Sequence, residues 1–213
     1  MPKKCVVLLS GGIDSATCLF LAKKEGFLPY CLFFDYGQRH LKEIKSARRI
    51  AASAGAELLV SKIGFPWKGS SLLDKSLEVP ARSSKGIPST YVPGRNIIFL
   101  SFALSCAESI KAGAIFIGAN ARDFSGYPDC RSDFYRAFRK VASTGIKKRD
   151  IEIRTPLINK TKAQIIRLGA ELKMPFEMTW SCYRGKVKPC NRCDSCRFRA
   201  KGFKEAGIDD PLV

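Results

Sequence analysis

Short apolar runs alternate along this chain with longer segments in which apolar residues recur at helical spacing. A short, uninterrupted apolar run is typical of a strand buried on both faces, because such a strand has no solvent-facing positions. Strands that are each followed by a helix form a parallel sheet covered on both faces, so we expect an α/β, doubly wound fold with a mainly parallel sheet. The pattern predicts strands at residues 5–9, 30–34, 57–61 and 114–118, and helices at residues 15–24, 41–54, 96–111, 133–143 and 162–172.

The segments that follow these strands carry most of the candidate chemistry. In a parallel sheet with right-handed crossovers, ligands bind at the carboxyl ends of the strands. Residues 10–15 follow the first predicted strand, residues 35–40 follow the second and residues 119–131 follow the fourth. Residues 64–95 contain several prolines and glycines and no clear period, and we interpret this segment as a candidate lid over the site.

Composition places the chain among globular proteins. It has 213 residues, of which 46% are hydrophobic and 26% are charged, values that are ordinary for a soluble protein. No apolar run approaches the roughly 18 residues that cross a bilayer, and the first residues show no cleavable signal pattern. We therefore expect a cytoplasmic protein with no membrane partner. We divide it into a main domain, residues 1–174, to which the nucleotide-binding and catalytic motifs described below belong, and a C-terminal appendage, residues 175–213, which contains the candidate zinc-binding cysteines described below.

The chain is strongly basic, because 37 lysines and arginines stand against 19 acidic residues and give a net charge of +18. Such a charge is typical of proteins that bind nucleic acid. The basic residues are spread along the sequence, however, and a basic protein also serves anionic small molecules such as ATP. Both interpretations stay open at this point, and we expect that nucleic acid is not required.

The segment at residues 10–15 reads Ser-Gly-Gly-Ile-Asp-Ser and joins a predicted strand to a predicted helix. Such a junction forms a cradle for an anion, because the first backbone N–H groups of a helix have no partners of their own. The glycines let the backbone approach the ligand, the serines add hydroxyl donors, and Asp14 either caps the helix or faces a metal. The lysine of a Walker A loop is absent. An ordinary strand–turn–helix junction is the alternative.

Basic residues in other loops are candidate phosphate contacts. Arg39, in the loop after the second strand, can pair with a phosphate through two parallel hydrogen bonds. The neighbouring His40 is either a catalytic residue or a residue that starts the helix or packs against it. Arg95 follows a Pro-Gly turn at a helix start, where it is a phosphate contact or part of the turn. Lys160 and Lys162 either reach a phosphate or are solvated. The residues assigned to ATP binding are Leu9, Ser10, Gly11, Gly12, Ile13, Asp14, Ser15, Ala16, Thr17, Cys18, Leu19, Arg39 and Arg95.

The densest polar run lies at residues 120–131 and contains two carboxylates, two arginines and a Gly-Tyr-Pro turn. A planar, purine-like ligand needs a stacking surface and acceptors for its N–H groups, and a carboxylate on that ligand needs a cation. Tyr127 is the candidate for the stacking surface, and Asp123 or Asp129 is the candidate for the acceptors. Arg131 is the candidate for the cation. The alternative is a salt-bridged surface loop.

The chain has nine cysteines and no export signal, which argues against a disulfide framework. Four of them are spaced Cys-x7-Cys-x2-Cys-x2-Cys, and two-residue spacers bring neighbouring thiolates onto one ion with tetrahedral geometry. Four cysteine ligands leave no position for water, so the pattern predicts a structural zinc site, with an iron–sulfur cluster as the alternative. Asn191, after the second of these cysteines, tolerates left-handed backbone geometry. The predicted ligands are Cys182, Cys190, Cys193 and Cys196.

Taken together, these motifs resemble the 7-cyano-7-deazaguanine synthase family of PP-loop ATP pyrophosphatases, which serves queuosine precursor biosynthesis. The resemblance covers nearly the whole chain in the family's order, although Asn191 replaces a glycine that is common in the family's cysteine motif. The shared segments are residues 10–15, Asp-Tyr-Gly-Gln-Arg-His at 35–40, Val-Pro-Gly-Arg-Asn at 92–96, the loop at 123–131, Thr-Pro-Leu at 155–157, Thr-Trp-Ser-Cys-Tyr at 179–183, the cysteine cluster and Arg199-x-x-Gly202-Phe203.

The resemblance implies that ATP, Mg²⁺ and Zn²⁺ are required and that a homodimer converts 7-carboxy-7-deazaguanine and ammonia into 7-cyano-7-deazaguanine, a precursor of modified tRNA bases. The carboxylate would become an acyl adenylate, ammonia would give the amide, and a second activation would give the nitrile. The loop at residues 10–15 would hold the pyrophosphate, with magnesium on the same oxygens. The residues assigned to catalysis are Asp14, Arg131 and Lys160, and those assigned to substrate binding are Asp123, Tyr127, Asp129 and Arg131.

Two functions of other classes stay open. A PP-loop enzyme that modifies tRNA, such as a sulfurtransferase, suits the basic charge, but it needs a reactive cysteine or a labile cluster. A cluster with all four ligands in place leaves no thiol in it to carry sulfur. A zinc-stabilised nucleotide-binding module is the other alternative, and it would not turn over ATP.

Overall fold

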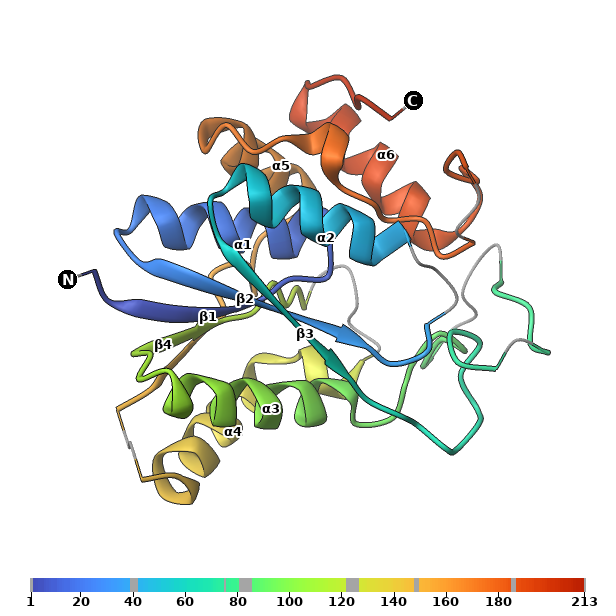
Figure 1. The fold of residues 1–213 in the computed structure, drawn as a ribbon. Helices are drawn as coiled ribbons and strands as arrows, with labels where there is room; N and C mark the ends of the chain where they lie inside the picture. Colours follow the sequence, from blue (N-terminus) through green and yellow to red (C-terminus); the bar gives the residue numbers. More distant parts are fainter. Residues whose placement is uncertain are drawn as a thin grey trace.

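A five-stranded sheet forms the centre of the molecule (Figure 1). Its strands are β1 (Lys4–Leu8), β2 (Leu28–Asp35), β3 (Glu57–Lys62), β4 (Ala114–Phe116) and β5 (Glu152–Arg154). They lie in the order β3-β2-β1-β4-β5, and every neighbouring pair is parallel. The computed structural model describes residues 2–38, 42–74, 76–80, 86–121, 127–147, 150–184 and 187–212.

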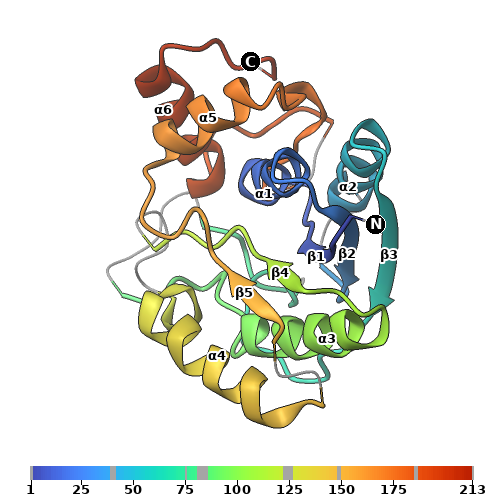
Figure 2. The ribbon, with the colours of Figure 1, turned by 90° about the vertical axis from the view of Figure 1, so that its left-hand side faces the viewer.

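Helices cover both faces of this sheet, as Figures 1 and 2 show. The helices are α1 (Ile13–Lys24), α2 (Lys42–Ser53), α3 (Arg95–Ser109), α4 (Ser132–Gly145), α5 (Lys162–Glu171) and α6 (Asp194–Ala206), with short 3-10 helices at Pro128–Cys130 and Phe176–Met178. One face carries α1, α2, α5 and α6, and the other carries α3 and α4. The predicted α/β, doubly wound class is therefore confirmed.

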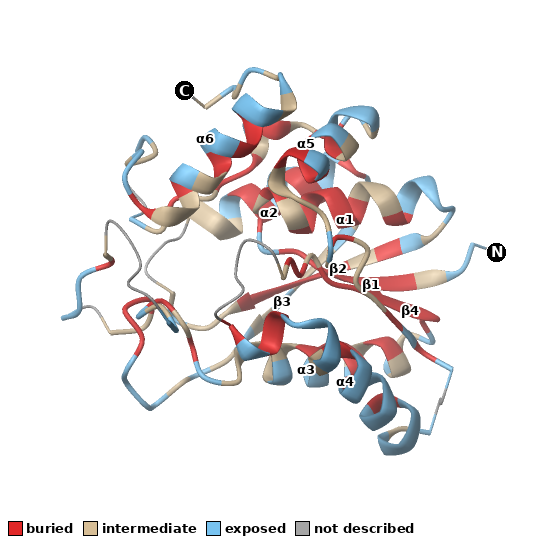
Figure 3. Ribbon diagram, turned by 180° about the vertical axis from the view of Figure 1, so that it is seen from behind, coloured by how far each residue is buried: buried red, intermediate tan, exposed pale blue. Residues whose placement is uncertain are grey.

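Each face of the sheet has its own hydrophobic core. Cys5 and Val7 of β1 are fully buried against the α1 side, whereas Val6 and Leu8 point to the α3 side, because successive side chains of a strand alternate between faces. Figure 3 shows the buried residues running along the strands and the inner sides of the helices. This two-sided burial explains why β1 is an uninterrupted apolar run in the sequence.

The predicted strands and helices end within two residues of the observed ones, but β5 and α6 were not predicted. In β5 the fully buried side chain is Ile153, between Glu152 and Arg154. A three-residue edge strand of this kind carries too few apolar positions to form a recognisable run. Helix α6 begins inside the cysteine cluster, with Cys193 as its N-cap. This segment was interpreted by its cysteine spacing, so its helical spacing of apolar residues was not recognised.

The C-terminal segment packs against the rest of the chain. A Cβ at Gly202 of α6 would lie 2.9 Å from the side chain of Ile166 in α5, and Phe176 and Phe203 belong to the core on the α1 side. The division after residue 174 stays a prediction. None of the helices in the described part of the chain is long and apolar enough to cross a membrane.

Candidate functional site

A cavity of about 280 Å³ opens at the carboxyl ends of β1, β2 and β4. Ligands bind at this edge in open parallel sheets, and the predicted loop at residues 10–15 lies there. The residues around it are Leu8, Leu9, Ser10, Gly12, Ile13, Asp14, Ser15, Leu32, Phe33, Phe34, Tyr36, Glu43, Leu72, Arg95, Asn96, Phe99, Ile117, Gly118, Ala119, Asn120, Tyr127, Cys130, Lys162, Trp180, Ser181, Tyr183, Ser195, Phe198 and Arg199.

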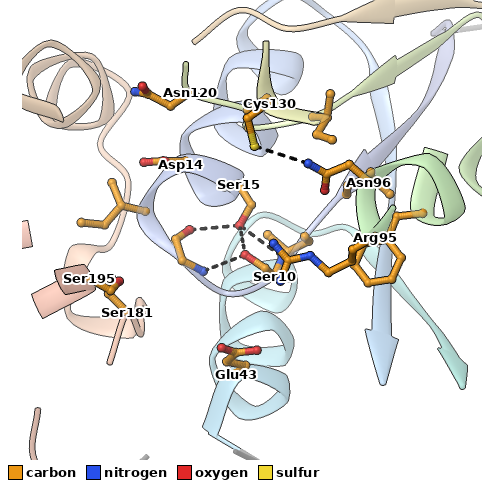
Figure 4. A pocket seen from close by; sticks show the side chains of 18 of the residues that line it. Ser10, Asp14, Ser15, Glu43, Arg95, Asn96, Asn120, Cys130, Ser181 and Ser195 are labelled. Atoms are coloured by element: carbon orange, nitrogen blue, oxygen red, sulfur yellow. Dashed lines mark hydrogen bonds between the residues drawn. The ribbon is translucent and has the colours of Figure 1, made fainter. Parts of the chain in front are cut away.

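The loop from Ser10 to Ser15, which we call the PP-loop, is shaped by hydrogen bonds among its own residues (Figure 4). The Ser15 hydroxyl donates to the carbonyl of Gly12 at 3.0 Å and accepts from the Ser10 N–H at 3.2 Å. The two serine hydroxyl oxygens lie 3.1 Å apart. Helix α1 starts immediately after Gly12, so its unpaired N–H groups and positive dipole end lie in this turn. The arrangement suits an anion.

Two glycines allow the close packing around the PP-loop. Gly11 has a φ of +84°, and a Cβ there would lie 2.6 Å from the carbonyl oxygen of Glu43 in α2. Gly118 follows β4, and a Cβ there would lie 2.7 Å from the carbonyl carbon of Asp14. A larger residue at either position would push a neighbouring backbone away and deform the loop.

Asp14 forms an ion pair with Lys162 across the cavity. The ammonium of Lys162 lies 2.7 and 2.8 Å from the two carboxylate oxygens, and both side chains are largely buried. Lys162 is the first residue of α5, whose N-cap is Thr161 in a reciprocal capping box with Gln164. The predicted Lys160 is not among the lining residues, and its carbonyl accepts a hydrogen bond from Asn120 at 2.8 Å.

A second part of the cavity consists of aromatic side chains around the cationic Arg95. Arg95 is the first residue of α3 and follows Gly94, which has a left-handed backbone conformation. The Arg95 guanidinium donates to the Tyr36 hydroxyl at 3.4 Å, and its charge also acts on Tyr127 and Tyr183. Burial raises the pKa of all three tyrosines, so they stay neutral phenols at neutral pH. We call the set Tyr36, Arg95, Phe99, Tyr127 and Tyr183 the aromatic wall.

Side chains outside the aromatic wall hold its rings in place. The ring of Phe99 stacks on Phe34 of β2 with centroids 4.1 Å apart, and the hydroxyls of Tyr127 and Thr90 lie 2.7 Å apart. Such contacts lock the side-chain orientations. A cation surrounded by aromatic faces suits a planar, anionic ligand.

The other predicted substrate residues lie elsewhere. Asp129 is buried, and its carboxylate accepts from the Asn96 N–H at 3.0 Å, so it caps the start of α3. Arg131 is exposed at the start of α4, and neither residue lines the cavity. Arg39 and Asp123 lie outside the described residues. Of the predicted substrate set, the structure brings Tyr127 to the cavity.

Some of the residues assigned to ATP binding line the cavity, and others do not. Ala16, Cys18 and Leu19 are buried in the core along α1, and the Thr17 hydroxyl donates to the Ile13 carbonyl at 2.9 Å. Gly11 shapes the PP-loop from outside the lining. The members that line the cavity are Leu9, Ser10, Gly12, Ile13, Asp14, Ser15 and Arg95.

Several lining residues had not been assigned from the sequence. Tyr36 and Tyr183 stand inside motifs that the family resemblance includes, which is the signal that points to them. Glu43 sits in the first turn of α2 and carries no sequence signal.

The four predicted zinc ligands converge. The sulfurs of Cys182, Cys190, Cys193 and Cys196 all lie within 4.8 Å of one another, and two of the pairs are 3.5 and 3.9 Å apart. Tetrahedral coordination with Zn–S bonds of ~2.3 Å places sulfurs about 3.8 Å apart, so this arrangement fits the ion. Asn191 has a φ of +53°, the left-handed geometry expected at the turn.

Hydrogen bonds among the sulfurs concentrate negative charge on one cysteine of the cluster. Those from Cys193 and Cys196 hold the pKa of the Cys182 thiol well below its usual range, and the same bonds raise the pKa of the Cys193 and Cys196 thiols. Backbone N–H groups also point at two sulfurs, with Cys190 donating to Cys182 at 3.4 Å and Cys193 donating to Cys190 at 3.3 Å. A metal requires ionised sulfurs, so its binding would release the remaining thiol protons.

Trp180 connects this cluster to the PP-loop. Its indole N–H donates to the Cys182 carbonyl at 3.0 Å, and its backbone N–H donates to the Gly11 carbonyl at 2.9 Å. The ammonium of Lys42 lies 4.2 Å from the centre of the indole ring. Because these contacts run from the cysteines to the loop, the cluster positions one edge of the cavity.

The preceding residue, Thr179, is held by a buried ion pair. Arg199 of α6 donates to both carboxylate oxygens of Asp210 at 2.7 and 2.8 Å, and its third donor reaches the Thr179 hydroxyl at 2.7 Å. Bidentate pairs of this kind fix both partners in orientation as well as distance. Helix α6 and the C-terminal residues thus brace the same edge.

The sequence matches a family described as "Queuosine biosynthesis protein QueC" over residues 4–207. It is 49% identical over 219 residues to a 7-cyano-7-deazaguanine synthase from Thermoplasma volcanium, with 100% of this chain and 91% of that protein covered. It is 51% identical over 217 residues to a protein of the same name from Methylococcus capsulatus, with 98% and 97% covered.

Solved structures of low identity share the fold. A 4-thiouridine synthetase in complex with RNA and bound ATP matches with a TM-score of 0.53 and 21% identity, over 95% of this chain and 53% of that one. An NMN synthetase from Francisella tularensis matches with a TM-score of 0.52 and 16% identity, over 98% and 78%. At such identities the likeness concerns the fold alone.

Proposed function

Since this chain belongs to the QueC family of 7-cyano-7-deazaguanine synthases, we propose that its cavity activates the carboxylate of 7-carboxy-7-deazaguanine with ATP and aminates it. The observation that carries the proposal is the presence, in one cavity, of an anion-binding loop and an aromatic wall built around an arginine. The first suits a triphosphate and the second suits a planar acid. Their meeting point is where a phosphorus and a carboxylate would react.

The PP-loop end holds the leaving group. As the bond between the α- and β-phosphates breaks, negative charge grows on the pyrophosphate, and the N–H groups at the start of α1 oppose it. The ammonium of Lys162 adds a positive charge at the same end. Magnesium bound with ATP would neutralise the same oxygens, with Asp14 as its protein ligand. Lys160, assigned from the sequence, stays a prediction.

The aromatic wall holds the deazapurine. Tyr127 and Tyr183 offer faces on which a flat ring can stack, and the guanidinium of Arg95 can meet the acid group beside the α-phosphate. Arg131, Asp123 and Asp129 stay predicted substrate residues, although Arg131 and Asp129 do not line the cavity.

The reaction balances with two molecules of ATP. A carboxylate oxygen attacks the α-phosphorus, pyrophosphate leaves and an acyl adenylate forms. Ammonia attacks the acyl carbon, and AMP leaves with that oxygen. The amide oxygen then attacks the α-phosphorus of the second ATP, whose pyrophosphate leaves, and loss of AMP and of the two N–H protons gives the nitrile. No protein nucleophile is needed, and positioning supplies much of the acceleration.

The cysteine cluster is proposed to hold a structural zinc. Its four sulfurs fill a tetrahedral shell and leave no position for a reacting water. A homodimer, a cytoplasmic location and independence from nucleic acid are further proposals that rest on the resemblance.

The net charge of +18 favours one other function, the sulfurtransferase. That chemistry needs an activated thiol. Burial raises the pKa of every cysteine outside the cluster, to about 12 for Cys5 and Cys31 and to about 11 for Cys130. The described cysteines therefore favour the synthase.

The test is a mass-spectrometric assay with 7-carboxy-7-deazaguanine, ammonium, ATP and magnesium. The proposal predicts a nitrile product together with AMP and pyrophosphate. ATP-dependent modification of RNA with the deazapurine left untouched would overturn it in favour of the tRNA-modifying alternative.

A further inference from the structure

Glu43 is a second carboxylate in the cavity, and the roles assigned above do not use it. It lies in the first turn of α2, where its carbonyl packs on Gly11 of the PP-loop. Figure 4 shows its carboxylate below Ser10 and the Arg95 guanidinium, on the side of the loop away from Asp14. Glu43 therefore lines the cavity on the side where Ser10 of the PP-loop and Arg95 of the aromatic wall lie, and the proposed function brings the acid and the α-phosphate together at these two parts.

The two carboxylates of the cavity have different partners. Asp14 is paired with Lys162 at 2.7 Å. Among the described residues, the carboxylate of Glu43 has neither a hydrogen bond nor an ion pair. The charged side chain that acts on its pKa is Arg95. Its other titratable neighbours are the phenols of Tyr36 and Tyr183, which are neutral. Glu43 is thus half-buried and available to a ligand.

The reaction needs a base at this place. In neutral water ammonia is almost entirely ammonium, which has no lone pair and cannot attack an acyl carbon. Burial raises the pKa of the Glu43 carboxyl to about 7, against the smaller opposing effect of Arg95, so it can accept a proton near neutral pH. A carboxylate flanked by aromatic rings also attracts a small cation such as ammonium.

We propose that Glu43 binds the ammonium ion and is the general base for the reacting nitrogen, an assignment that rests on the proposed function. One N–H bond of ammonium breaks, its proton goes to the Glu43 carboxylate, and the lone pair that remains forms the new C–N bond. AMP departs with the electron pair of the C–O bond. The nitrogen's second proton passes to solvent, which also takes the proton from Glu43 and resets the base.

The same position serves the nitrile-forming step. After the amide oxygen is adenylated, the nitrogen must lose its N–H protons while the C–O bond to AMP breaks. Glu43, beside that nitrogen, accepts one of the two protons in this step as well, and the other passes to solvent. A single base therefore suffices for both halves of the reaction.

The test compares two nucleophiles in Glu43→Gln. Hydroxylamine is a weaker base than ammonia and is neutral at pH 7, so it attacks an acyl adenylate without a base and gives a hydroxamate. We expect kcat/KM for ammonium to fall by about 10²- to 10⁴-fold, the usual contribution of a general base, while hydroxamate formation persists. Acid-dependent exchange of pyrophosphate into ATP should also persist, which shows that the variant is folded and forms the adenylate.

The controls separate the possible failures. Glu171→Gln, at an exposed position in α5, should behave as the wild type. Unchanged ammonium kinetics in Glu43→Gln would overturn the assignment, as would loss of pyrophosphate exchange in a variant that unfolds at the wild-type temperature. Wild-type protein with no acid-dependent exchange would instead contradict the proposed function itself. If Glu43→Gln does not fold, Glu43→Asp, which withdraws the carboxylate by one methylene, should show the same selective loss to a smaller degree.

Discussion

The PP-loop, at one end of the cavity, consists of consecutive residues that hydrogen-bond to one another. The aromatic wall, in contrast, consists of side chains from separate parts of the chain. In the PP-loop, the Ser10 and Ser15 hydroxyls lie 3.1 Å apart, and the side-chain hydrogen bonds that shape the turn join residues at most five positions apart. In the aromatic wall, Tyr36 follows β2, Arg95 starts α3 and Tyr183 belongs to the cysteine-rich segment. The PP-loop is a local structure, and the aromatic wall exists only in the folded chain.

The difference extends to how each part is supported. The PP-loop is held at its edge by Trp180, which hydrogen-bonds to both Gly11 and Cys182. The same cysteine-rich segment continues into Tyr183 of the aromatic wall. A disturbance of the cluster should therefore reach both parts, whereas a substitution in either part should stay in that part.

The largest expected effect removes this shared support. Cys193→Ser takes away one of four metal ligands, and loss of a structural metal typically destabilises by more than about 4 kcal/mol. We expect the variant to lose zinc and stability together, measured by metal analysis and thermal unfolding. The matched control is Cys106→Ser, outside the cluster, which should retain the metal. A stable, metal-free Cys193→Ser protein would show that the cluster does not support the fold.

The next effect confines the change to the PP-loop end. Asp14→Ala removes the partner of Lys162 and the proposed magnesium ligand. Turnover should fall by roughly 10³-fold, as when a preorganised group that stabilises transition-state charge is lost. Zinc content should stay close to that of the wild type, whereas the thermal midpoint should fall, because the largely buried ammonium of Lys162 loses its carboxylate partner. Wild-type turnover in this variant would remove Asp14 from the mechanism.

The third effect concerns the pH dependence of stability at Glu43, which faces Arg95, Tyr36 and Tyr183. Burial raises its folded pKa to about 7 from 4.5, so the folded protein binds more protons than the unfolded chain between these values. The contribution of Glu43 to wild-type stability should therefore fall as pH rises from 4.5 to 7, and Glu43→Gln should lack this contribution.

Between pH 4.5 and 7, the unfolding free energy of Glu43→Gln relative to that of the wild type should thus rise by roughly 1 to 3 kcal/mol. Above pH 7 this difference should stay constant. Urea unfolding at a series of pH values measures it. A difference independent of pH would mean that the Glu43 carboxyl has an ordinary pKa.

The smallest effect probes the aromatic wall. Tyr127→Phe removes the hydroxyl that lies 2.7 Å from that of Thr90 but keeps the ring. Stability should drop by about 1 kcal/mol, the usual net value of one hydrogen bond, as urea unfolding would show. The KM for the deazapurine should change little, because the ring remains. A large rise in that KM would mean that the hydroxyl itself recognises the substrate.

The sequence could predict features that depend on neighbouring residues. Strand β1, the PP-loop and α1 follow one another without a break, and their apolar run, glycines and helical period each indicate one structure. The cysteine cluster is similar, because its spacing alone requires convergence on one ion. The strand and the helix were predicted within two residues of their observed bounds, and the four cysteines converge as predicted, whereas their binding of ATP and zinc stays a prediction.

Features that depend on tertiary packing were beyond the sequence. Lys160 and Lys162 look alike in the sequence, and only the position of α5 against α1 directs Lys162 to Asp14. Asp129 has the chemistry of a purine acceptor but caps α3 through Asn96. Glu43 reaches the cavity because α2 packs on Gly11, and no local pattern announces that contact.

The central claim is that both carboxylate oxygens leave through adenylation in this one cavity. The most direct measurement uses 7-carboxy-7-deazaguanine labelled with ¹⁸O at both carboxylate oxygens and follows the label by mass spectrometry. The account predicts that each of the two AMP molecules released per nitrile carries one ¹⁸O, with none in pyrophosphate. Label found in water or in inorganic phosphate would contradict it.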